Sequence, residues 1–515
     1  MLPDYAPTPL TDFSRPEHAA AMEAALAGVR ARLGGTWPLW LDGERVTTDA
    51  TRPSVDPADH ATVVGHAAEA GPEHLERAFV AAARAFPAWR RTPLEVRARY
   101  LLRCAARMRE RRLELAAWMV FEVSKSWVEA DADVAEAIDF LEFYAREAIR
   151  LGGPQPLAPY PGEELELRYL PLGTAAVIPP WNFPLAITVG MTAAALVAGN
   201  PTILKPAHQA PVIAGLFAEL LHECGLPPGV LGFVTGDGAA LGSAMVEDPR
   251  TRIVAFTGSK AVGLGIARKA GEVRPGQRGL KRAILELGGK DATVIDDDCD
   301  LEAAISGAVA AAFGFQGQKC SAGSRLIVHT RVYDEVVAEV ARRADALAVG
   351  HPRDRAHFMG AMIDDKALAK TLGYVEAGRG EGRLVAGGGR GPDGGWFVRP
   401  TVFADVESRA RLMQEEIFGP VLAIGRARDW EHALAWANDT EYGLTGAVFS
   451  RNRDHLEQAR HEFHVGNLYL NRKCTGALVG VHPFGGFDMS GTDSKAGGRD
   501  YLLLFTQAKS IAEKL

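Results

Sequence analysis

The chain has 515 residues, which is long enough to bury large cores and predicts two to four domains. Charged residues make up 23% and hydrophobic residues 47%, as is usual for a soluble globular enzyme. The formal net charge of −7, with no long basic run, argues against nucleic acid as a partner. The five cysteines are few, odd in number and widely spaced, and the N-terminus lacks an export or organelle signal, so we expect a cytoplasmic protein.

The first 170 residues predict mostly helices. An Ala-rich helical pattern covers 16–33, hydrophobic residues recur at three- and four-residue spacing over 72–90 and 94–122, and a long helix is expected over about 127–151. A short β-like segment spans 39–46. A breaker-rich link at 152–162 precedes residues 164–170, which alternate like an exposed strand.

The next part of the chain alternates between strand and helix. Residues 169–204 carry no charge, but Pro179, Pro180 and Pro184 interrupt them, so we expect buried strand, loop and helix and no membrane association. Strands are expected at 175–178, 201–204, 231–234 and 253–256, with helices at 185–198, 210–224 and 239–246. This rhythm predicts a parallel sheet with helices on both faces, the architecture that binds dinucleotides at its carboxyl edge.

A second alternating region begins at residue 283. Its expected strands are 283–287, 324–329, 398–403, 421–426, 447–450 and 466–470, with helices at 301–314 and 332–346. The chain is therefore predicted to be an α/β protein with two doubly wound parallel sheets. Residues 501–512 look like a strand without a partner, and a terminal strand of this kind often pairs with another subunit, which predicts an oligomer.

The candidate nucleophile is Cys320, which lies among small, polar and basic residues that can stabilise a thiolate and admit a substrate. The alternative is a small buried hydrophobe, and Cys104, Cys224 and Cys299 fit that description. The acidic run around Cys299 is interpreted as a turn capping the helix from residue 301 rather than as a metal site. The histidines His455, His461 and His464 do not build a metal site either, although His461 and His464 are expected to share a helix face.

Two further side chains support a reactive Cys320. Glu286 ends an apolar strand, where partial burial raises the pKa of a carboxyl toward general-base use; a charge facing water is the alternative. Asn182 lies in a rigid Pro-rich loop and can donate its amide to an oxyanion, as can the backbone N–H of Cys320, whereas a turn-stabilising Asn is the competing interpretation.

Several residues could hold a dinucleotide, each ambiguous by itself. Small residues at 256–259 follow a buried strand and offer bare N–H groups to a pyrophosphate, but no GxGxxG spacing is present. Lys205 closes another strand and can reach ribose hydroxyls, and Glu416, in the run 416–420, can fix a nicotinamide ribose.

Taken together and in order, the motifs Pro-Trp-Asn-Phe-Pro (180–184), Lys-Pro-Ala (205–207), Phe-Thr-Gly-Ser (256–259), Glu-Leu-Gly-Gly-Lys (286–290), Gly-Gln-Lys-Cys (317–320), Glu-Ile-Phe-Gly-Pro (416–420) and Pro-Phe-Gly-Gly (483–486) resemble the aldehyde dehydrogenase superfamily. The resemblance implies Cys320 as nucleophile, Glu286 as general base, and Asn182 with the Cys320 amide as oxyanion hole. The cofactor residues that it implies are Ile178, Trp181, Lys205, His208, Gly258, Ser259, Glu416 and Phe418.

The resemblance also implies the domain organisation. A Rossmann-like NAD(P)-binding domain would comprise 1–151 and 173–285, and a catalytic domain would comprise 286–490. A small oligomerisation β-flap would be built from 152–172 and 491–515. A homo-oligomer, either a dimer or an assembly of dimers, is expected.

Residues 463–486 are most similar to the L-glutamate γ-semialdehyde (1-pyrroline-5-carboxylate) dehydrogenase branch. In that branch Gly476 and Ala477 would offer N–H groups to the substrate α-carboxylate, aided by Ser321. Phe183 and Phe484 would sandwich the aliphatic part. Glu136 would face the α-ammonium, although periodicity alone does not select it among the other acids of its helix. No proline-oxidising domain is recognised, so a single activity in proline catabolism is expected.

The implied reaction is oxidation of the semialdehyde to glutamate through a thiohemiacetal and a thioester on Cys320, with water activated by Glu286. His208 stands where the superfamily often has a Glu that accepts from ribose hydroxyls, so we predict NAD as cofactor with NADP also accepted. Three alternatives stay open: a dehydrogenase for another semialdehyde such as succinate semialdehyde, a thiol esterase or acyltransferase, and a catalytically silent binding protein.

Overall fold

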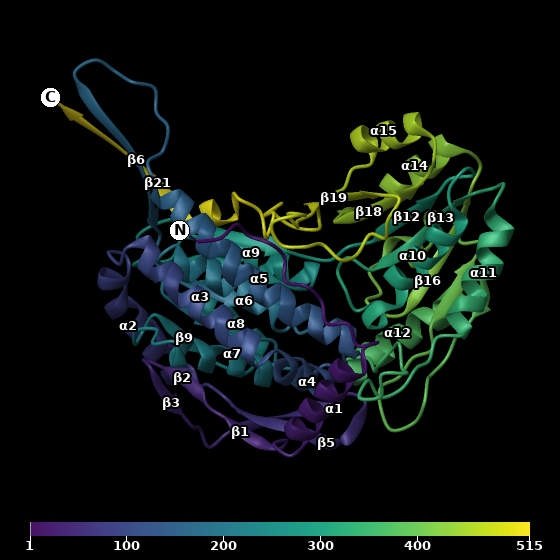
Figure 1. Cartoon of the computed structure of the whole chain (residues 1–515), viewed down its shortest axis with the longest axis horizontal. Helices are drawn as coiled ribbons and strands as arrows, with labels where there is room; N and C mark the ends of the chain where they lie inside the picture. The colour runs from purple at the N-terminus through teal and green to yellow at the C-terminus, as the bar shows by residue number, and fades with distance from the viewer. Residues whose placement is uncertain (1) are drawn as a thin grey trace.

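The computed structural model describes residues 2–515, and two seven-stranded sheets form its two lobes (Figure 1). The first sheet contains β2 (Leu39–Leu41), β3 (Glu44–Val46), β7 (Thr174–Ile178), β8 (Thr202–Leu204), β9 (Leu231–Phe233), β10 (Thr251–Thr257) and β11 (Arg282–Glu286), in the order β11-β10-β7-β8-β9-β2-β3. The four strands β10, β7, β8 and β9 are parallel, as predicted. The strand expected at 283–287 in the second region is β11, which instead pairs parallel with β10 at the edge of this first sheet, and β2 joins antiparallel to β9.

Helices cover both faces of this sheet. They are α2 (Pro72–Trp89), α6 (Ala186–Val197), α7 (Pro211–Glu223), α8 (Gly238–Glu247) and α9 (Lys260–Gly271). Successive residues of a strand point to opposite faces. Ala175 and Val177 accordingly pack in the core that contains α6 and α7, whereas Ala176 packs with α2 and α8. Uncharged strands such as β7 are apolar throughout because both faces are buried.

The N-terminal segment supplies four more helices. These are α1 (Pro16–Arg30), α3 (Leu94–Glu110), α4 (Arg112–Glu122) and α5 (Trp127–Gly152). The helix predicted over 94–122 is therefore two helices, broken at Arg111. The β-like segment 39–46 is the hairpin of β2 and β3, and its turn residues Asp42 and Gly43 have φ of 58° and 81°. An Asp-Gly pair with two positive φ angles is the favoured two-residue hairpin turn.

The second sheet has the same plan. It contains β12 (Asp291–Ile295), β13 (Gly323–His329), β14 (Arg383–Ala386), β15 (Thr401–Ala404), β16 (Val421–Ala427), β18 (Thr445–Phe449) and β19 (Asn467–Leu470), in the order β14-β15-β16-β13-β12-β18-β19. All neighbours are parallel except β14 and β15. The helices α10 (Leu301–Phe313) and α11 (Tyr333–Asp345) pack on one face and α14 (Trp430–Asn438) and α15 (Arg453–Glu462) on the other.

Smaller elements complete the chain. A three-stranded sheet that the sequence did not predict is formed by β1 (Gly35–Trp37), β4 (Thr51–Asp56) and β5 (Asp59–Ala68). A short ladder joins β17 (Tyr442–Gly443) to β20 (Phe487–Asp488), and two further helices are α12 (Asp365–Gly378) and α13 (Arg411–Gln414). Within residues 2–515, no helix combines the length and the apolar character needed to cross a membrane.

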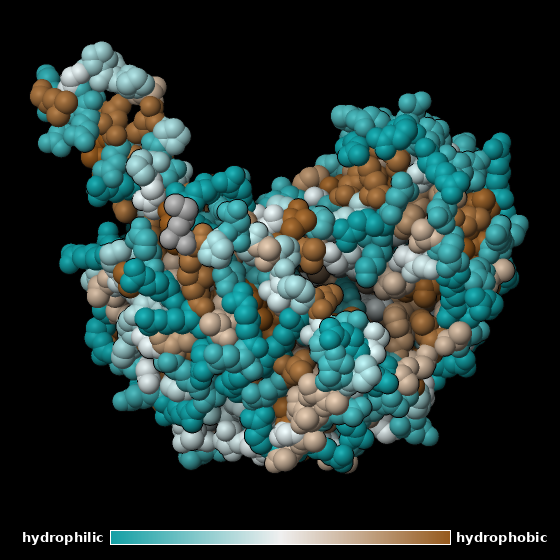
Figure 2. Space-filling model, in the orientation of Figure 1, coloured by the Kyte–Doolittle hydropathy of each residue, from teal (hydrophilic) through white to brown (hydrophobic). Residues whose placement is uncertain are grey.

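A two-stranded ribbon projects from the first lobe (Figure 1). It consists of β6 (Glu163–Pro171) and β21 (Thr506–Lys514), paired antiparallel from Pro171↔Thr506 to Glu163↔Lys514. The strand expected over 501–512 thus begins at Thr506, after the 3-10 helix η2 (Tyr501–Phe505), and its partner lies in the same chain. Figure 2 shows the ribbon clear of the body, with hydrophobic residues among hydrophilic ones.

Candidate active site

Cys320 lies in a strained loop between α10 and β13. The 3-10 turn η1 (Gly314–Gly317) follows α10, and within it Phe315 and Gln316 have φ of 50° and 58°. Such left-handed angles in non-glycine residues persist only where the surroundings impose them. The Gln316 amide donates to the carbonyl oxygens of Ser124 at 3.1 Å and of Ala361 at 2.8 Å, which fixes this conformation. The loop is therefore anchored immediately before the nucleophile.

The thiol of Cys320 is a weaker acid than its neighbours in sequence predict. Burial raises its pKa well above the usual range, and the carboxyl groups of Asp291 and Glu286 add to the increase. The basic neighbour Lys319 does not stabilise a thiolate, because its Nζ is paired with Glu129 at 2.6 Å. The expectation of thiolate stabilisation by basic neighbours is thus wrong, and the thiol needs a base to remove its proton.

The base predicted from the sequence is Glu286. It is the last residue of β11 and is buried, so the alternative of a charge facing water is wrong. One carboxylate oxygen, Oε1, accepts from the hydroxyl of Ser494, whereas Oε2 has no partner among residues 2–515. Burial raises the pKa of Glu286 to about 8, and the Ser494 hydrogen bond acts in the opposite direction. The carboxyl can therefore exchange a proton near neutral pH.

Asn182 reaches the same loop from the first lobe. It follows β7, is buried, and its Nδ2 donates to the carbonyl oxygen of Gln318 at 3.1 Å, two residues before Cys320. An amide nitrogen has two hydrogens, so one is left for a second acceptor. The structure thus brings Asn182 and Cys320 together as the sequence predicts; the oxyanion role stays a prediction.

The predicted adenosine residues lie at the carboxyl end of β8. Lys205 is buried, its Nζ donates to the carbonyl oxygen of Pro206 at 3.1 Å, and burial lowers its pKa to about 8. His208 is exposed at the surface, and partial burial of its ring followed by the charge of Arg52 lowers its pKa. Gly258 and Ser259 lie between β10 and α9, where the Ser259 side chain makes no cap to the helix. The first N–H groups of α9 are therefore available to an anion.

The residues predicted to bind the nicotinamide end of the cofactor come from both lobes. Glu416 Oε1 accepts from the Gly289 N–H at 3.1 Å, and burial raises the Glu416 pKa. The rings of Trp181 and Phe418 meet edge to face with centroids 5.6 Å apart. Ile178 ends β7, just before the loop that carries Trp181 and Asn182. Their binding to the nicotinamide and ribose of a dinucleotide stays a prediction.

Helix α5 carries three acids on one face, among them the predicted substrate residue Glu136. Glu129, Asp133 and Glu136 follow a spacing of four and three residues and so share one helix face. Asp133 pairs with buried Lys125 at 2.8 Å, and Glu129 pairs with Lys319. Glu136 has no ion pair among residues 2–515. Burial raises its pKa to about 8, and nearby Asp133 adds to the increase.

Lys125 also orders the aromatic residues of the site. Its Nζ lies 4.1 Å from the ring centroid of Phe183 and 4.7 Å from that of Phe315. Phe183 makes no stacking contact with Phe484 in residues 2–515. The sandwich of these two rings around an aliphatic chain therefore stays a prediction.

The predicted anchor loop follows β19. The Sγ of buried Cys474 lies 3.5 Å from the carbonyl oxygen of Ser321, so the residue that precedes the loop 475–477 contacts the residue after the nucleophile. Gly476 has φ of 84°, in the left-handed region that favours glycine. Ser321, Gly476 and Ala477 therefore lie on adjoining segments, as the sequence predicts.

Comparison with known proteins identifies the family. Residues 44–511 match the aldehyde dehydrogenase family. The chain belongs to this family. Among its relatives, the 1-pyrroline-5-carboxylate dehydrogenases of Geobacillus thermodenitrificans and Bacillus subtilis are 54% and 51% identical over 513 residues, with 100% of both chains covered in each comparison.

Solved structures agree. A Thermus 1-pyrroline-5-carboxylate dehydrogenase with bound NAD is 49% identical and has a TM-score of 0.98 over 100% of both chains. Proline utilization A from Bdellovibrio bacteriovorus is 42% identical with a TM-score of 0.98 over 99% of this chain and 53% of that one. The resemblance and the fold class predicted from sequence are confirmed, and an aldehyde-oxidising enzyme is favoured over a thiol esterase or acyltransferase.

Sequence reasoning missed several residues of this aldehyde dehydrogenase site. Lys125 and Ser494 are far from Cys320 in sequence, and no local pattern links them to Phe183 and Glu286. The sequence identifies Lys319 only as a basic neighbour of the nucleophile. Its pairing with Glu129, 190 residues away on α5, has no local signal in the sequence.

The acidic run and the histidines form structural contacts. Asp300 caps α10 by accepting from the Ala303 N–H, as predicted. Carboxylate oxygens of Asp296, Asp297 and Asp298 lie within 4.8 Å of one another, and Asp296 Oδ2 lies 2.6 Å from Nδ1 of His455. His464 follows the end of α15, so the helix face expected for His461 and His464 is wrong.

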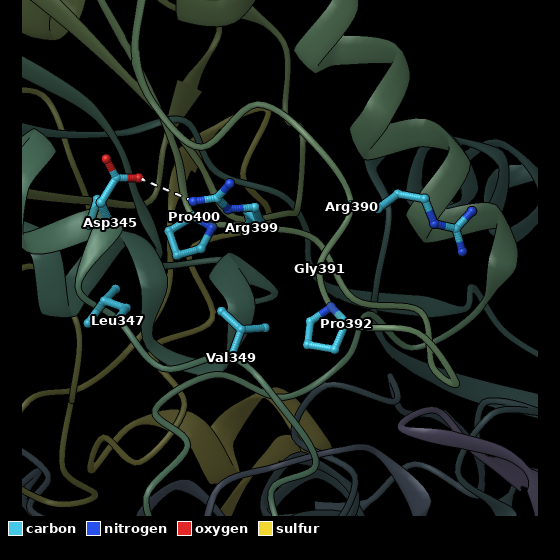
Figure 3. Close-up of a pocket in the computed structure, with 9 residues that line it drawn as sticks. Asp345, Leu347, Val349, Arg390, Gly391, Pro392, Arg399 and Pro400 are labelled. Carbon is cyan, nitrogen blue, oxygen red and sulfur yellow. Dashed lines mark ion pairs between the residues drawn. The ribbon is translucent and has the colours of Figure 1, made fainter.

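A separate cavity of about 260 Å³ lies on the second lobe of the dehydrogenase (Figure 3). Leu347, Val349 and Pro400 line it, and the Arg399 guanidinium pairs with Asp345 across 3.7 Å at its rim. None of the predicted site residues lines this cavity. The chemistry inferred from the sequence is therefore not located there.

Proposed function

We propose that this enzyme oxidises L-glutamate γ-semialdehyde, the hydrolysed form of 1-pyrroline-5-carboxylate, to L-glutamate with NAD⁺. The observation that carries the substrate choice is the face of α5, where Glu129 and Asp133 are paired with lysines and Glu136 is left without a cation. A substrate α-ammonium would supply the missing positive charge. The names and near-complete coverage of the relatives support the same substrate.

The residues at the dinucleotide edge fit NAD⁺. Ser259 leaves the N-terminus of α9 open to a pyrophosphate, Lys205 closes β8 beside the ribose position, and Glu416 lies opposite on the second lobe. When bound, NAD⁺ supplies a hydride acceptor for the aldehyde carbon. The remaining chemistry belongs to the chain itself.

Glu286 takes the proton of the Cys320 thiol, whose raised pKa leaves it neutral near pH 7. The sulfur then adds to the aldehyde carbon, and the oxygen that becomes negative is held by Nδ2 of Asn182 and the N–H of Cys320. Glu286 passes the thiol proton to solvent before the second half of the reaction. After oxidation to the thioester, its carboxylate accepts a proton from water, which attacks the carbonyl carbon. The carbon–sulfur bond breaks, the thiolate takes the proton back from Glu286, and glutamate leaves with its new carboxyl group ionised.

The proposed organisation assigns cofactor binding to 1–151 and 173–285, catalysis to 286–490 and oligomerisation to 152–172 and 491–515. The two sheets support the first two units, and the projecting ribbon of β6 and β21 supports the third as part of a homo-oligomer. All five cysteines are free and four are buried, which supports a cytoplasmic location.

The deciding experiment measures NADH formation from pyrroline-5-carboxylate and from succinate semialdehyde under the same conditions. Because the proposed anchors bind an amino acid end, kcat/KM is expected to be far higher for the first substrate. Preference for succinate semialdehyde would overturn the assignment. Loss of turnover in C320A, with NAD⁺ binding retained, would attribute the chemistry to Cys320.

A further inference from the structure

The loop after β19 is held from behind by a single arginine. Nη2 of Arg472 donates to the carbonyl oxygens of Thr475 at 3.1 Å and of Gly476 at 3.0 Å. The N–H groups of Gly476 and Ala477 have no acceptor among residues 2–515. One side of this loop is thus fully engaged by a guanidinium, and the other side is left with free donors.

Peptide geometry links the two sides. In a trans peptide group the N–H points opposite to the C=O. The carbonyl of Thr475 belongs to the same peptide group as the N–H of Gly476, and the carbonyl of Gly476 to that of Ala477. When Arg472 holds both carbonyls, both N–H groups therefore point away from it. The φ of 84° at Gly476 allows two successive carbonyls to converge on one nitrogen.

Arg472 is itself held in place by side chains that lie before and after the loop. Its Cζ lies 4.4 Å from the ring centroid of Tyr469, on β19. Its Nη1 lies 3.2 Å from Nε2 of His482, beyond the far end of the loop. Burial, followed by the charge of Arg472, lowers the pKa of His482 and so favours the neutral imidazole beside the guanidinium. The three side chains form a clasp across 469–482.

We propose that Arg472 is a positioning residue for recognition of the substrate carboxylate, acting through the N–H groups of Gly476 and Ala477. This inference rests on the proposed function. The guanidinium orients both donors, and it polarises both amides, because a charged donor on a carbonyl makes the attached N–H a stronger donor. Arg472 acts on the backbone rather than on the substrate.

The test compares R472M and R472K with R451M, in which an exposed arginine of the same lobe is replaced. Each is assayed with pyrroline-5-carboxylate and with butanal, which lacks the carboxylate, and L-glutamate is measured as a competitive inhibitor. R472M should raise KM for the semialdehyde and the inhibition constant of glutamate by about 10- to 100-fold, the effect of losing a hydrogen bond to a charged group. The kcat for the semialdehyde and kcat/KM for butanal should change by less than about threefold.

R472K retains one charged donor and should recover part of the affinity for the semialdehyde, whereas R451M should match the wild type. Unchanged KM in R472M, or equal losses with both aldehydes, would overturn the clasp while leaving the proposed function intact. A wild-type enzyme with no preference for the semialdehyde over butanal would instead overturn the proposed function, and the clasp with it.

Discussion

The ionisation of Glu286 controls the proposed chemistry at Cys320. Burial raises the pKa of Glu286 to about 8, so the carboxyl is mostly protonated at pH 7 and ionises as the pH rises. Since the ionised form is the base, kcat/KM should increase about tenfold per pH unit below that pKa and level off above it. A pH profile between 6 and 9 measures this. The Ser494 hydrogen bond lowers the pKa of Glu286, so S494A should shift the rise to higher pH.

Glu136 should decide recognition of the amino group. Its pKa is raised to about 8 by burial, so the carboxylate that binds an ammonium forms as the pH increases. In E136Q, KM for glutamate semialdehyde should increase by about 10-fold or more, as for loss of a charged hydrogen bond. Succinate semialdehyde, which lacks the ammonium, should be unaffected. E110Q, on an exposed acid of α3, is the matched control. Equal effects on both aldehydes would contradict the assignment.

His208 should permit use of NADP⁺. A carboxylate at this position would repel a 2′-phosphate, whereas the neutral imidazole beside Lys205 and Arg52 does not. H208E should therefore raise KM for NADP⁺ by about 10-fold or more, and KM for NAD⁺ should change little, because only one cofactor carries the extra charge. Steady-state kinetics with both cofactors measures the ratio. A wild-type KM for NADP⁺ too high to measure beside a normal NAD⁺ value would contradict it.

For single residues, the sequence predicts the properties that depend on neighbours within the same motif. Glu286 ends an apolar strand, a pattern that predicts either a buried carboxyl with a raised pKa or a charge facing water, and the neighbouring motifs are needed to choose between them. The proposed roles of Glu136 and Arg472 could not be predicted in this way, because they depend on which partners the fold brings close to each side chain. Nothing in the helix pattern tells that Glu129 and Asp133 are paired and Glu136 is not. The raised pKa of Cys320 likewise follows first from its burial in the fold and then from carboxyl groups that the fold brings close to it.

Helix α5 is bound to the site through the pair of Lys125 and Asp133, both fully buried. Asp133 Oδ1 also accepts from the Ala186 N–H at 2.6 Å, at the start of α6. Removal of one member leaves an uncompensated buried charge, so D133N should lower the free energy of unfolding by about 3–5 kcal/mol. The double variant K125M/D133N should lose less. Denaturant unfolding of the three proteins measures this, and a D133N as stable as the wild type would contradict it.

Helices and strands with a clear hydrophobic pattern were predictable from the sequence. Strand pairings between segments far apart in the chain were not. The largely apolar strands from β7 to β10 and the long α5 lie close to their predicted positions. The sheet of β1, β4 and β5 was missed because β4 is polar and contains Pro53, which weakens a strand pattern. The C-terminal strand was recognised, but its partner β6 lies more than 300 residues earlier in the chain.

The whole molecule presents a long ribbon that its own fold does not cover. A two-stranded ribbon is marginally stable by itself, and both of its edges have unpaired backbone groups. In β6, Leu165, Leu167 and Tyr169 share one face, since strand side chains alternate. Their cross-strand partners, Ala512, Ser510 and Ala508, are small. A second subunit on this face would bury the stripe and complete the sheet.

The stripe therefore predicts an oligomer that two substitutions can dissociate. Charged side chains at the centre of an apolar interface are strongly unfavourable, so L165D/L167D should shift the mass measured by light scattering from a dimer or larger assembly to a monomer. E164Q/E166Q, on the opposite face of the same strand, should keep the wild-type mass. Because the ribbon lies outside both cores, L165D/L167D should retain the far-ultraviolet circular dichroism of the wild type. A wild type that is already monomeric would contradict the role of the ribbon and leave the active-site assignments untouched.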